Sequence, residues 1–115
     1  MIVAKIFRDE ENKIKKYTIE GHANYDSYGK DIVCAAMSVL SHTTLLSLME
    51  LCGIDEKTII YSIDDRGFLS VELPKDIEEN KLDKTQILLE SLVVGIKSII
   101  ESYPEYVTLK MGRCN

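Results

Sequence analysis

The fold is organised around residues 31–53, DIVCAAMSVLSHTTLLSLMELCG, in which positions 32–49 carry no formally charged side chain. A run of eighteen such residues is long enough to cross a membrane as a helix. Several hydroxyl side chains and the imidazole of His42 interrupt it, however, and hydroxyls bond readily to preceding helix carbonyls. We therefore predict a buried helix in a small domain, with Asp31 as its N-cap and Gly53 as its C-terminal stop.

On each side of this helix lies a pattern typical of a β-hairpin. Before it, residues 1–7 alternate apolar and polar side chains, and a polar turn leads to a returning strand at 15–20. After it, strands at 57–63 and 68–73 flank the turn sequence DDRG. The segment 23–30 between the first hairpin and the helix is polar and is predicted to be a loop.

A second helix and a last strand complete the chain. Asp83 is the predicted cap of this helix, Pro104 follows it, and residues 106–111 are predicted to form the strand. The apolar stripe at helical spacing consists of Ile87, Leu88, Leu92, Val93, Ile96, Ile99 and Ile100. The predicted order is β-β-α-β-β-α-β, an α+β fold in which two long helices pack on a mostly antiparallel sheet. No linker or repeat divides residues 1–115, so we predict a single domain.

Composition and cysteine use restrict the classes of function. The chain holds 14 Lys and Arg against 19 Asp and Glu, a formal net charge of −5, which argues against a broad nucleic-acid surface. The first residues lack the basic start and apolar core of a secretory signal. Cys34, Cys52 and Cys114 are odd in number and form no Cys-x-x-Cys pair. We expect a cytoplasmic protein with reduced thiols, not bound to a membrane, and without a metal or cofactor.

Cys34 is the candidate nucleophile. With Asp31 as the N-cap, this thiol lies in the first helical turn, where unpaired backbone N–H groups and the helix dipole favour a thiolate. The same N–H groups are placed to hold the oxyanion formed when sulfur attacks a carbonyl. A cysteine in an apolar helix is more often a plain core residue, and that reading stays open on spacing alone. Cys52 and Cys114 are predicted to be structural.

His22 is the candidate base. It follows Gly21 at the end of a strand, so its imidazole should emerge at the rim of the sheet. The other histidine, His42, lies eight residues beyond Cys34 on the same helix, about 12 Å of axial rise, too far for a hydrogen bond. We therefore predict that His42 is an interior or interface histidine.

The run GHANYDSYGKDIVCAAMSVL, residues 21–40, resembles the signature of the bacterial ribosomal-processing cysteine protease family, known as Prp. The length of the chain and the predicted order of elements extend the resemblance over the whole sequence. Lys30, Met37 and Val39 fall where the family is expected to vary. The matching positions are Gly21, His22, Ala23, Tyr25, Gly29, Asp31, Ile32, Val33, Cys34, Ala35, Ala36 and Ser38.

The resemblance implies an endopeptidase that removes a short N-terminal extension from the precursor of ribosomal protein L-twenty-seven. It also implies cleavage after an aromatic pair and a homodimer. By the same resemblance, Cys34 is the nucleophile and His22 the general base. Gly21 resembles a hinge for the histidine and its loop, and Asp31 resembles a supporting residue of the site.

Two further hypotheses concern the loop. As an N-cap Asp31 would accept a backbone N–H bond, whereas turned toward His22 it would orient the imidazole. We hypothesise that Asp31 caps the helix at rest and that substrate reorganises residues 23–30. Tyr25 and Tyr28 would then close over a bound aromatic pair, and Gly21 and Ser38 are the other predicted substrate-binding residues. The list of candidate substrate contacts is thus Gly21, Tyr25, Tyr28 and Ser38.

Two other classes of function stay open at this point. One is a non-catalytic ribosome-assembly or adaptor domain, in which residues 21–34 form a binding turn. The other is a cysteine-dependent transferase or redox sensor. A sensor usually needs a resolving thiol near the reactive one, and the sequence around Cys34 supplies none.

Overall fold

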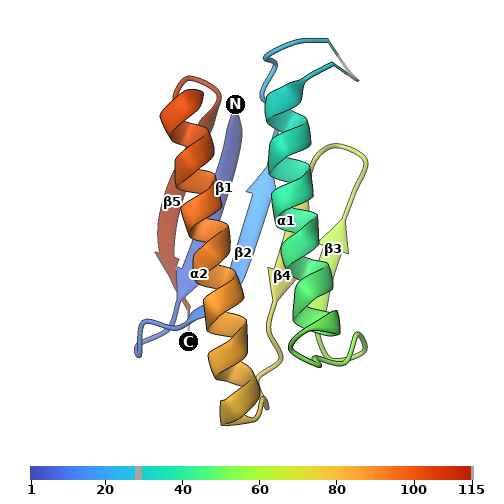
Figure 1. The fold of residues 1–115 in the computed structure, drawn as a ribbon, viewed down its shortest axis with the longest axis vertical. Coiled ribbons are helices and arrows are strands. Elements are labelled where there is room, and N and C mark those ends of the chain that lie inside the picture. Colours follow the sequence, from blue (N-terminus) through green and yellow to red (C-terminus); the bar gives the residue numbers. More distant parts are fainter. Residues whose placement is uncertain (28–29, 115) are drawn as a thin grey trace.

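The structure, a computed structural model, describes residues 1–27 and 30–114. Within these residues, two helices lie side by side on one face of a single five-stranded sheet (Figure 1). The elements are β1 (Ile2–Arg8), β2 (Ile14–Glu20), α1 (Ile32–Glu50), β3 (Ile60–Ile63), β4 (Leu69–Glu72), α2 (Glu79–Ser102) and β5 (Val107–Arg113). The predicted α+β class and the order β-β-α-β-β-α-β are confirmed.

The strands follow the order β3-β4-β2-β1-β5 across the sheet. All neighbouring pairs are antiparallel except β1 with β5, which run parallel, so the sheet is mixed. The pairing of β2 with β4 joins the two hairpins, and its register places Ile19 opposite Leu69. The end of β2 therefore lies beside the start of β4, which brings the tip of the second hairpin close to Gly21 and His22.

The helix-covered face of the sheet forms the core. The alternation in β1 is confirmed, because Ile2, Ala4 and Ile6 are all buried. Each such aliphatic side chain larger than alanine contributes roughly 1.5–3 kcal/mol when it leaves water. The side chains that α1 buries include hydroxyls as well as apolar groups: Val33, Met37, Ser41, Thr44, Leu45 and Leu48. In length and composition α1 would also pass for a membrane span, but it packs against α2 and shares the buried core with the sheet, where Tyr17 of β2 donates a hydrogen bond to its Ser41 carbonyl.

The ends of α1 agree with the sequence. Asp31 occupies the N-cap, and the helix ends at Glu50. The chain turns away at Gly53, whose φ of 68° lies in the left-handed region that glycine adopts without strain. Cys52 is buried just beyond the last helical turn.

The start of α2 differs from the prediction. The helix begins at Glu79, with Glu78 in the N-cap position, so Asp83 does not cap it and lies exposed within the helix. Nothing in the four residues before Asp83 breaks a helix, and Leu82 among them packs against the core. Ile87 is 73% exposed and does not belong to the buried stripe, whereas Leu89 does.

The predicted strand at 57–63 is shorter in the structure, where β3 begins at Ile60. The carboxylate of Asp55 accepts a bond from the backbone N–H of Lys57, and its carbonyl accepts one from Thr58. This turn holds the first residues of the predicted strand out of the sheet.

Candidate active site

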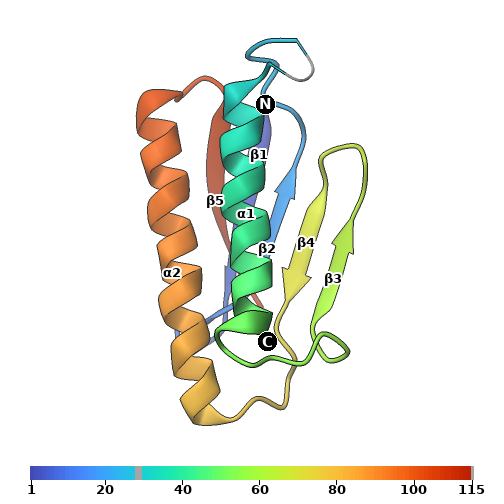
Figure 2. The same ribbon diagram turned by 45° about the vertical axis from the view of Figure 1, so that its right-hand side comes forward.

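A cavity of about 650 Å³ opens between α1 and the tip of the β3–β4 hairpin, the two elements seen side by side in Figure 2. The predicted site residues Gly21, His22, Asp31, Cys34 and Ser38 all line it. They come from the end of β2, the following loop and the first two turns of α1. The fold thus gathers five of the seven predicted catalytic and substrate-binding residues around one space.

Cys34 lies half-buried in the first turn of α1. Its Sγ accepts a hydrogen bond from the backbone N–H of Ala23, at 3.3 Å. Within residues 1–27 and 30–114, no hydrogen bond joins this sulfur to His22, although both side chains line the cavity. Catalytic hydrogen bonds are often long in ligand-free sites and tighten when substrate binds. The thiol and the imidazole therefore share a site without forming a pair at rest.

The backbone around His22 is closely packed. Gly21 has a φ of 91°, and a Cβ there would collide with the carbonyl oxygen of Met1. The N-terminal ammonium of Met1 donates a hydrogen bond to the carbonyl of His22, at 2.6 Å. A Cβ on Gly67, in the hairpin turn, would lie 3.1 Å from Cε1 of His22. Both glycines are thus required by close approach, while the exposed His22 ring keeps room to turn. The role of Gly21 as a hinge stays a prediction.

The carboxylate of Asp31 joins the loop to the helix. Oδ1 accepts bonds from the backbone N–H groups of Val33 and Cys34, each at 3.0 Å, and Oδ2 accepts one from Tyr25, at 2.9 Å. Burial alone would raise the pKa of this carboxyl, but bonds from the backbone of Cys34, Tyr25 and Asp26 and from the Cys34 side chain outweigh it and lower the pKa. Asp31 therefore caps α1 as predicted and is held as a carboxylate.

This cap changes the expected oxyanion site. The N–H groups of Val33 and Cys34 are bonded to Asp31 Oδ1, and that of Ala35 is bonded to the Asp31 carbonyl. The prediction that these groups are unpaired is therefore wrong for this state of the molecule. The backbone donor that approaches the sulfur is instead the N–H of Ala23, which comes from the loop.

Tyr25 does not line the described part of the cavity. Its ring packs edge-on against Tyr103 and Tyr106, with centroids 5.4 and 5.1 Å away. These two rings lie where α2 passes into β5, so Tyr25 fastens the loop to that corner. Contact between Tyr25 and a substrate would need the loop to move. Tyr28, the other predicted closing residue, lies outside the described residues, as does Gly29.

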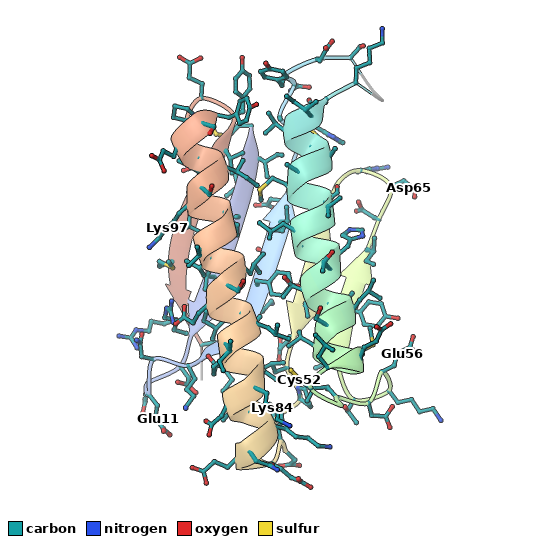
Figure 3. The ribbon with its side chains drawn as sticks, in the orientation of Figure 1. Glu11, Cys52, Glu56, Asp65, Lys84 and Lys97 are labelled. Atoms are coloured by element: carbon teal, nitrogen blue, oxygen red, sulfur yellow. The ribbon has the colours of Figure 1, made fainter. Side chains whose placement is uncertain are left out.

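Two parts of the cavity wall were not predicted from the sequence. One is the hairpin tip, which contributes Asp64, Asp65, Gly67 and Phe68; Figure 3 labels Asp65 there. It is a wall only because β4 pairs with β2, a long-range contact that no local pattern reveals. The other is His42, which is exposed and lines the cavity, so it is not an interior histidine; the interface alternative stays a prediction.

The spacing of α1 contained a signal for His42. Residues four and eight positions after Cys34 fall on nearly the same face of a helix. Those residues are Ser38 and His42, and both line the cavity with Cys34. The helical spacing from Cys34 would therefore have predicted that His42 lies on the same face of α1 and lines the same cavity.

The other two thiols lie elsewhere. Cys52 is buried beyond the far end of α1 (Figure 3), and burial raises the pKa of its thiol. Burial, with the nearby carboxylates of Asp9 and Glu72, also raises the pKa of Cys114. Over the described residues, no three His, Cys, Asp or Glu side chains are grouped to hold a metal ion.

Replacing Asp31 by alanine should lower the free energy of unfolding by about 1 kcal/mol at pH 7, because the helix loses its cap. The pKa of Asp31 is lower in the folded chain, so the unfolded chain takes up the proton first as the pH falls. The stabilisation should be fully present above the unfolded pKa of about 4 and should decrease progressively as the pH falls toward the lower pKa of the folded chain. Urea unfolding of wild type and Asp31→Ala between pH 7 and pH 3 measures this. Asp76→Ala, at an exposed carboxylate, is the control, and a difference that grows in acid would contradict the account.

Known proteins are similar to this chain in sequence and architecture. Residues 1–108 match the sequence profile of the family described as cysteine protease Prp. The ribosomal processing cysteine protease Prp of Bacillus subtilis is 28% identical over 105 residues, which cover 91% of this chain and 92% of that protein. A crystal structure from Streptococcus mutans is 34% identical with a TM-score of 0.81, covering 99% of this chain and 96% of its own.

A further crystal structure is that of the essential ribosomal processing protease Prp from Staphylococcus aureus, in complex with a covalently linked product peptide. It is 26% identical with a TM-score of 0.81, and the match covers 96% of this chain and 99% of that one. The similarity in sequence and architecture thus extends along almost the whole chain, including the strand that precedes His22 and the helix that carries Cys34. The protein belongs to the cysteine protease Prp family.

Proposed function

We propose that this protein is a cysteine endopeptidase that removes the N-terminal extension from the precursor of ribosomal protein L-twenty-seven in the cytoplasm. The observation that carries the proposal is one cavity lined by both the thiol of Cys34 and the imidazole of His22, in a member of this family. The names of its relatives, which are ribosomal processing proteases, support the choice of substrate class.

The reaction uses His22 as base and then as acid. The exposed imidazole turns toward Cys34 and takes the thiol proton, and Sγ attacks the carbonyl carbon of the scissile bond. A carbon–sulfur bond forms while the carbonyl oxygen becomes an oxyanion. His22 then gives the proton to the leaving nitrogen, the carbon–nitrogen bond breaks, and a thioester remains. Water, deprotonated by His22, hydrolyses the thioester and restores the thiol.

The oxyanion needs donors that are aimed at it before the reaction. The N–H of Ala23 already points at the sulfur, and it can pass to the new oxygen once sulfur has bonded to carbon. A second donor, the N–H of Cys34, becomes free if Asp31 leaves it and turns to His22. Substrate binding thus completes the site by moving Asp31 from a capping to an orienting role.

The cavity walls suit a particular kind of peptide. Ile2, Ile19, Met37 and Phe68 supply apolar surface for the aromatic pair that precedes the cleaved bond. Gly21 and Ser38 lie beside that surface, and Tyr25 and Tyr28 close over it when the loop moves. Carboxylates that line the cavity favour basic residues in the bound peptide, and the net charge of −5 on the chain has the same effect. These carboxylates are Asp26, Asp64 and Asp65.

A peptide that spans the cleavage site of the precursor tests the proposal. Wild type should cleave it once, after the aromatic pair, as read by mass spectrometry. Cys34→Ala and His22→Ala should lower kcat by roughly 10³-fold or more, because each removes a member of one catalytic unit. Cys114→Ala changes a thiol remote from the cavity and serves as the control.

The same experiment separates the protease from an adaptor. Cys34→Ala should still bind the peptide, since it loses a reacting atom and no large surface. A non-catalytic adaptor predicts no cleavage by wild type and unchanged function in Cys34→Ala. Full cleavage by purified Cys34→Ala would exclude the nucleophile that we assign.

We also propose that two copies of the chain pair through the outer face of the two helices. Ile32, Val39 and Leu46 on α1 and Val94 on α2 are each more than half exposed. Between the helices runs an open groove whose walls include the small residues Ala35, Ala36, Gly95 and Ser98. Apolar ridges and a groove of small residues on one surface can interlock with their own copy, as a two-fold dimer requires.

Val39→Glu should abolish this pairing, because it puts a charge in the centre of the apolar face. Sedimentation velocity should show a dimer for wild type and a monomer for the variant. Ile60→Glu changes an equally apolar, exposed residue at the sheet edge and should leave the dimer intact. A monomeric wild type at micromolar concentration, or dissociation by Ile60→Glu alone, would contradict the proposal.

A further inference from the structure

Two tyrosine rings are brought together by the turn that joins α2 to β5. The turn has the sequence YPEY, residues 103–106, and the backbone N–H of Tyr106 donates a hydrogen bond to the carbonyl of Tyr103, at 3.1 Å. Proline in the second position favours such a four-residue turn, whose first and last residues lie close together. The N–H of Tyr103 donates to the carbonyl of Ile99 in α2, and the N–H of Ile2 in β1 donates to the carbonyl of Tyr106. The two rings are therefore attached to a rigid corner of the fold.

The ring of Tyr25 packs on this pair. It meets both rings edge-on, with interplanar angles of 81° and 79°, a geometry that aromatic pairs prefer. Figure 1 shows the loop before α1 and the turn after α2 at the same end of the molecule. Tyr103 and Tyr106 are half-buried against the core and do not line the catalytic cavity, whereas Tyr25 is 41% exposed. We call the rings of Tyr25, Tyr103 and Tyr106 the aromatic clasp.

The aromatic clasp is connected to the catalytic residues through the backbone of the loop. Tyr25 places its ring in the clasp, and its N–H donates the bond to Oδ2 of Asp31. Two residues earlier, the N–H of Ala23 donates to the sulfur of Cys34. Only Asn24 separates the two donors, and consecutive Cα atoms lie about 3.8 Å apart, so a movement of Tyr25 also displaces Ala23. A contact on the far side of the loop thus fixes two bonds to residues of the site.

We propose that Tyr103 and Tyr106 are positioning residues that hold the site in its resting state, and that a peptide has to release Tyr25 from them to complete the site. At rest, Asp31 occupies the N–H of Cys34, which the proposed reaction needs for the oxyanion. Asp31 can leave either by breaking its bond to Tyr25 or by taking Tyr25 along. The aromatic clasp stabilises that bond by fixing Tyr25, and it opposes the movement directly. This inference rests on the proposed function and adds the control of its site by a corner of the fold outside the cavity.

The sign of the effect depends on the state in which the aromatic clasp exists. A contact that is present in the free protein and absent from the complex stabilises only the free protein, so it weakens binding by its own free energy. One aromatic pair corresponds to roughly a two- to tenfold change in an equilibrium constant. Loss of a corner ring should therefore tighten the binding of every peptide that displaces Tyr25, by the same factor. A ring that only supported a binding-competent fold would have the opposite effect, because its loss would weaken binding.

Replacement of one corner ring by leucine tests the inference, because leucine keeps an apolar side chain against the core and removes the aromatic contact. Tyr103→Leu and Tyr106→Leu should each lower KM for the precursor peptide roughly two- to tenfold. They should leave kcat unchanged, since the bound site is the same in variant and wild type. Tyr106→Phe keeps the edge-on ring and should have the KM of wild type.

The matched control is Tyr61→Leu, at an exposed tyrosine of β3 that does not line the cavity, and it should change neither constant. Calorimetric titration of the peptide into Cys34→Ala, with and without Tyr106→Leu, should show the same two- to tenfold gain in affinity without cleavage. An unchanged or higher KM in both leucine variants, or an unchanged or weaker affinity in the titration, would overturn the proposal.

Amide hydrogen exchange in the free protein separates the aromatic clasp from the protease function, because it needs no peptide. Tyr106→Leu should raise the exchange rates of the Ala23 and Tyr25 amides roughly two- to tenfold and leave those of the β2–β4 pair unchanged. If wild type neither binds nor cleaves the peptide, the protease function fails, and the exchange rates still decide whether the clasp fixes the loop. Unchanged exchange at both amides would overturn the clasp even in a protein that cleaves the peptide.

Discussion

The carboxylate of Asp31 is the interaction on which the site depends. One side chain accepts backbone N–H bonds from the first turn of α1 and from Tyr25 in the loop, so it fixes two segments that would otherwise be independent. The loop in turn places the N–H of Ala23 against the sulfur of Cys34. In the resting site the Asp31 cap therefore occupies the backbone N–H groups of Val33 and Cys34, which cannot bind an oxyanion at the same time. In the mechanism that we propose, a peptide that draws Asp31 away assembles the catalytic arrangement as it binds.

The fold supplies the second constraint, because it determines which elements face Cys34. Tyr17 on β2 donates a buried hydrogen bond to the carbonyl of Ser41 on α1, at 2.9 Å, and holds the strand that leads to His22 against the helix that carries Cys34. The β2–β4 pairing then sets the second hairpin beside them. A chain of 115 residues thereby obtains a cavity with walls from three separate parts of its sequence.

Local features were predictable and long-range ones were not. Caps, turns and alternating strands depend on neighbouring residues, which is why Asp31, Gly53 and β1 were predicted correctly. Asp83 resembled a cap, but none of the four residues before it breaks a helix, and Leu82 among them packs against the core, so the helix begins earlier, at Glu79. Tyr25 found partners more than 70 residues away, and the hairpin tip became a wall through strand pairing. These long-range contacts depend on the order of the strands in the sheet, and no local sequence pattern specifies that order.

The role of Cys34 as the nucleophile that attacks the peptide carbonyl can be tested with a peptide chloromethyl ketone that ends in the residue before the cleaved bond. Mass spectrometry of the digested protein locates the adduct. We expect one adduct per chain, on Cys34, with activity lost in proportion to the adduct and with protection by the uncleaved peptide. Inactivation with the adduct on Cys52 or Cys114, or full activity in a chain modified at Cys34, would contradict it.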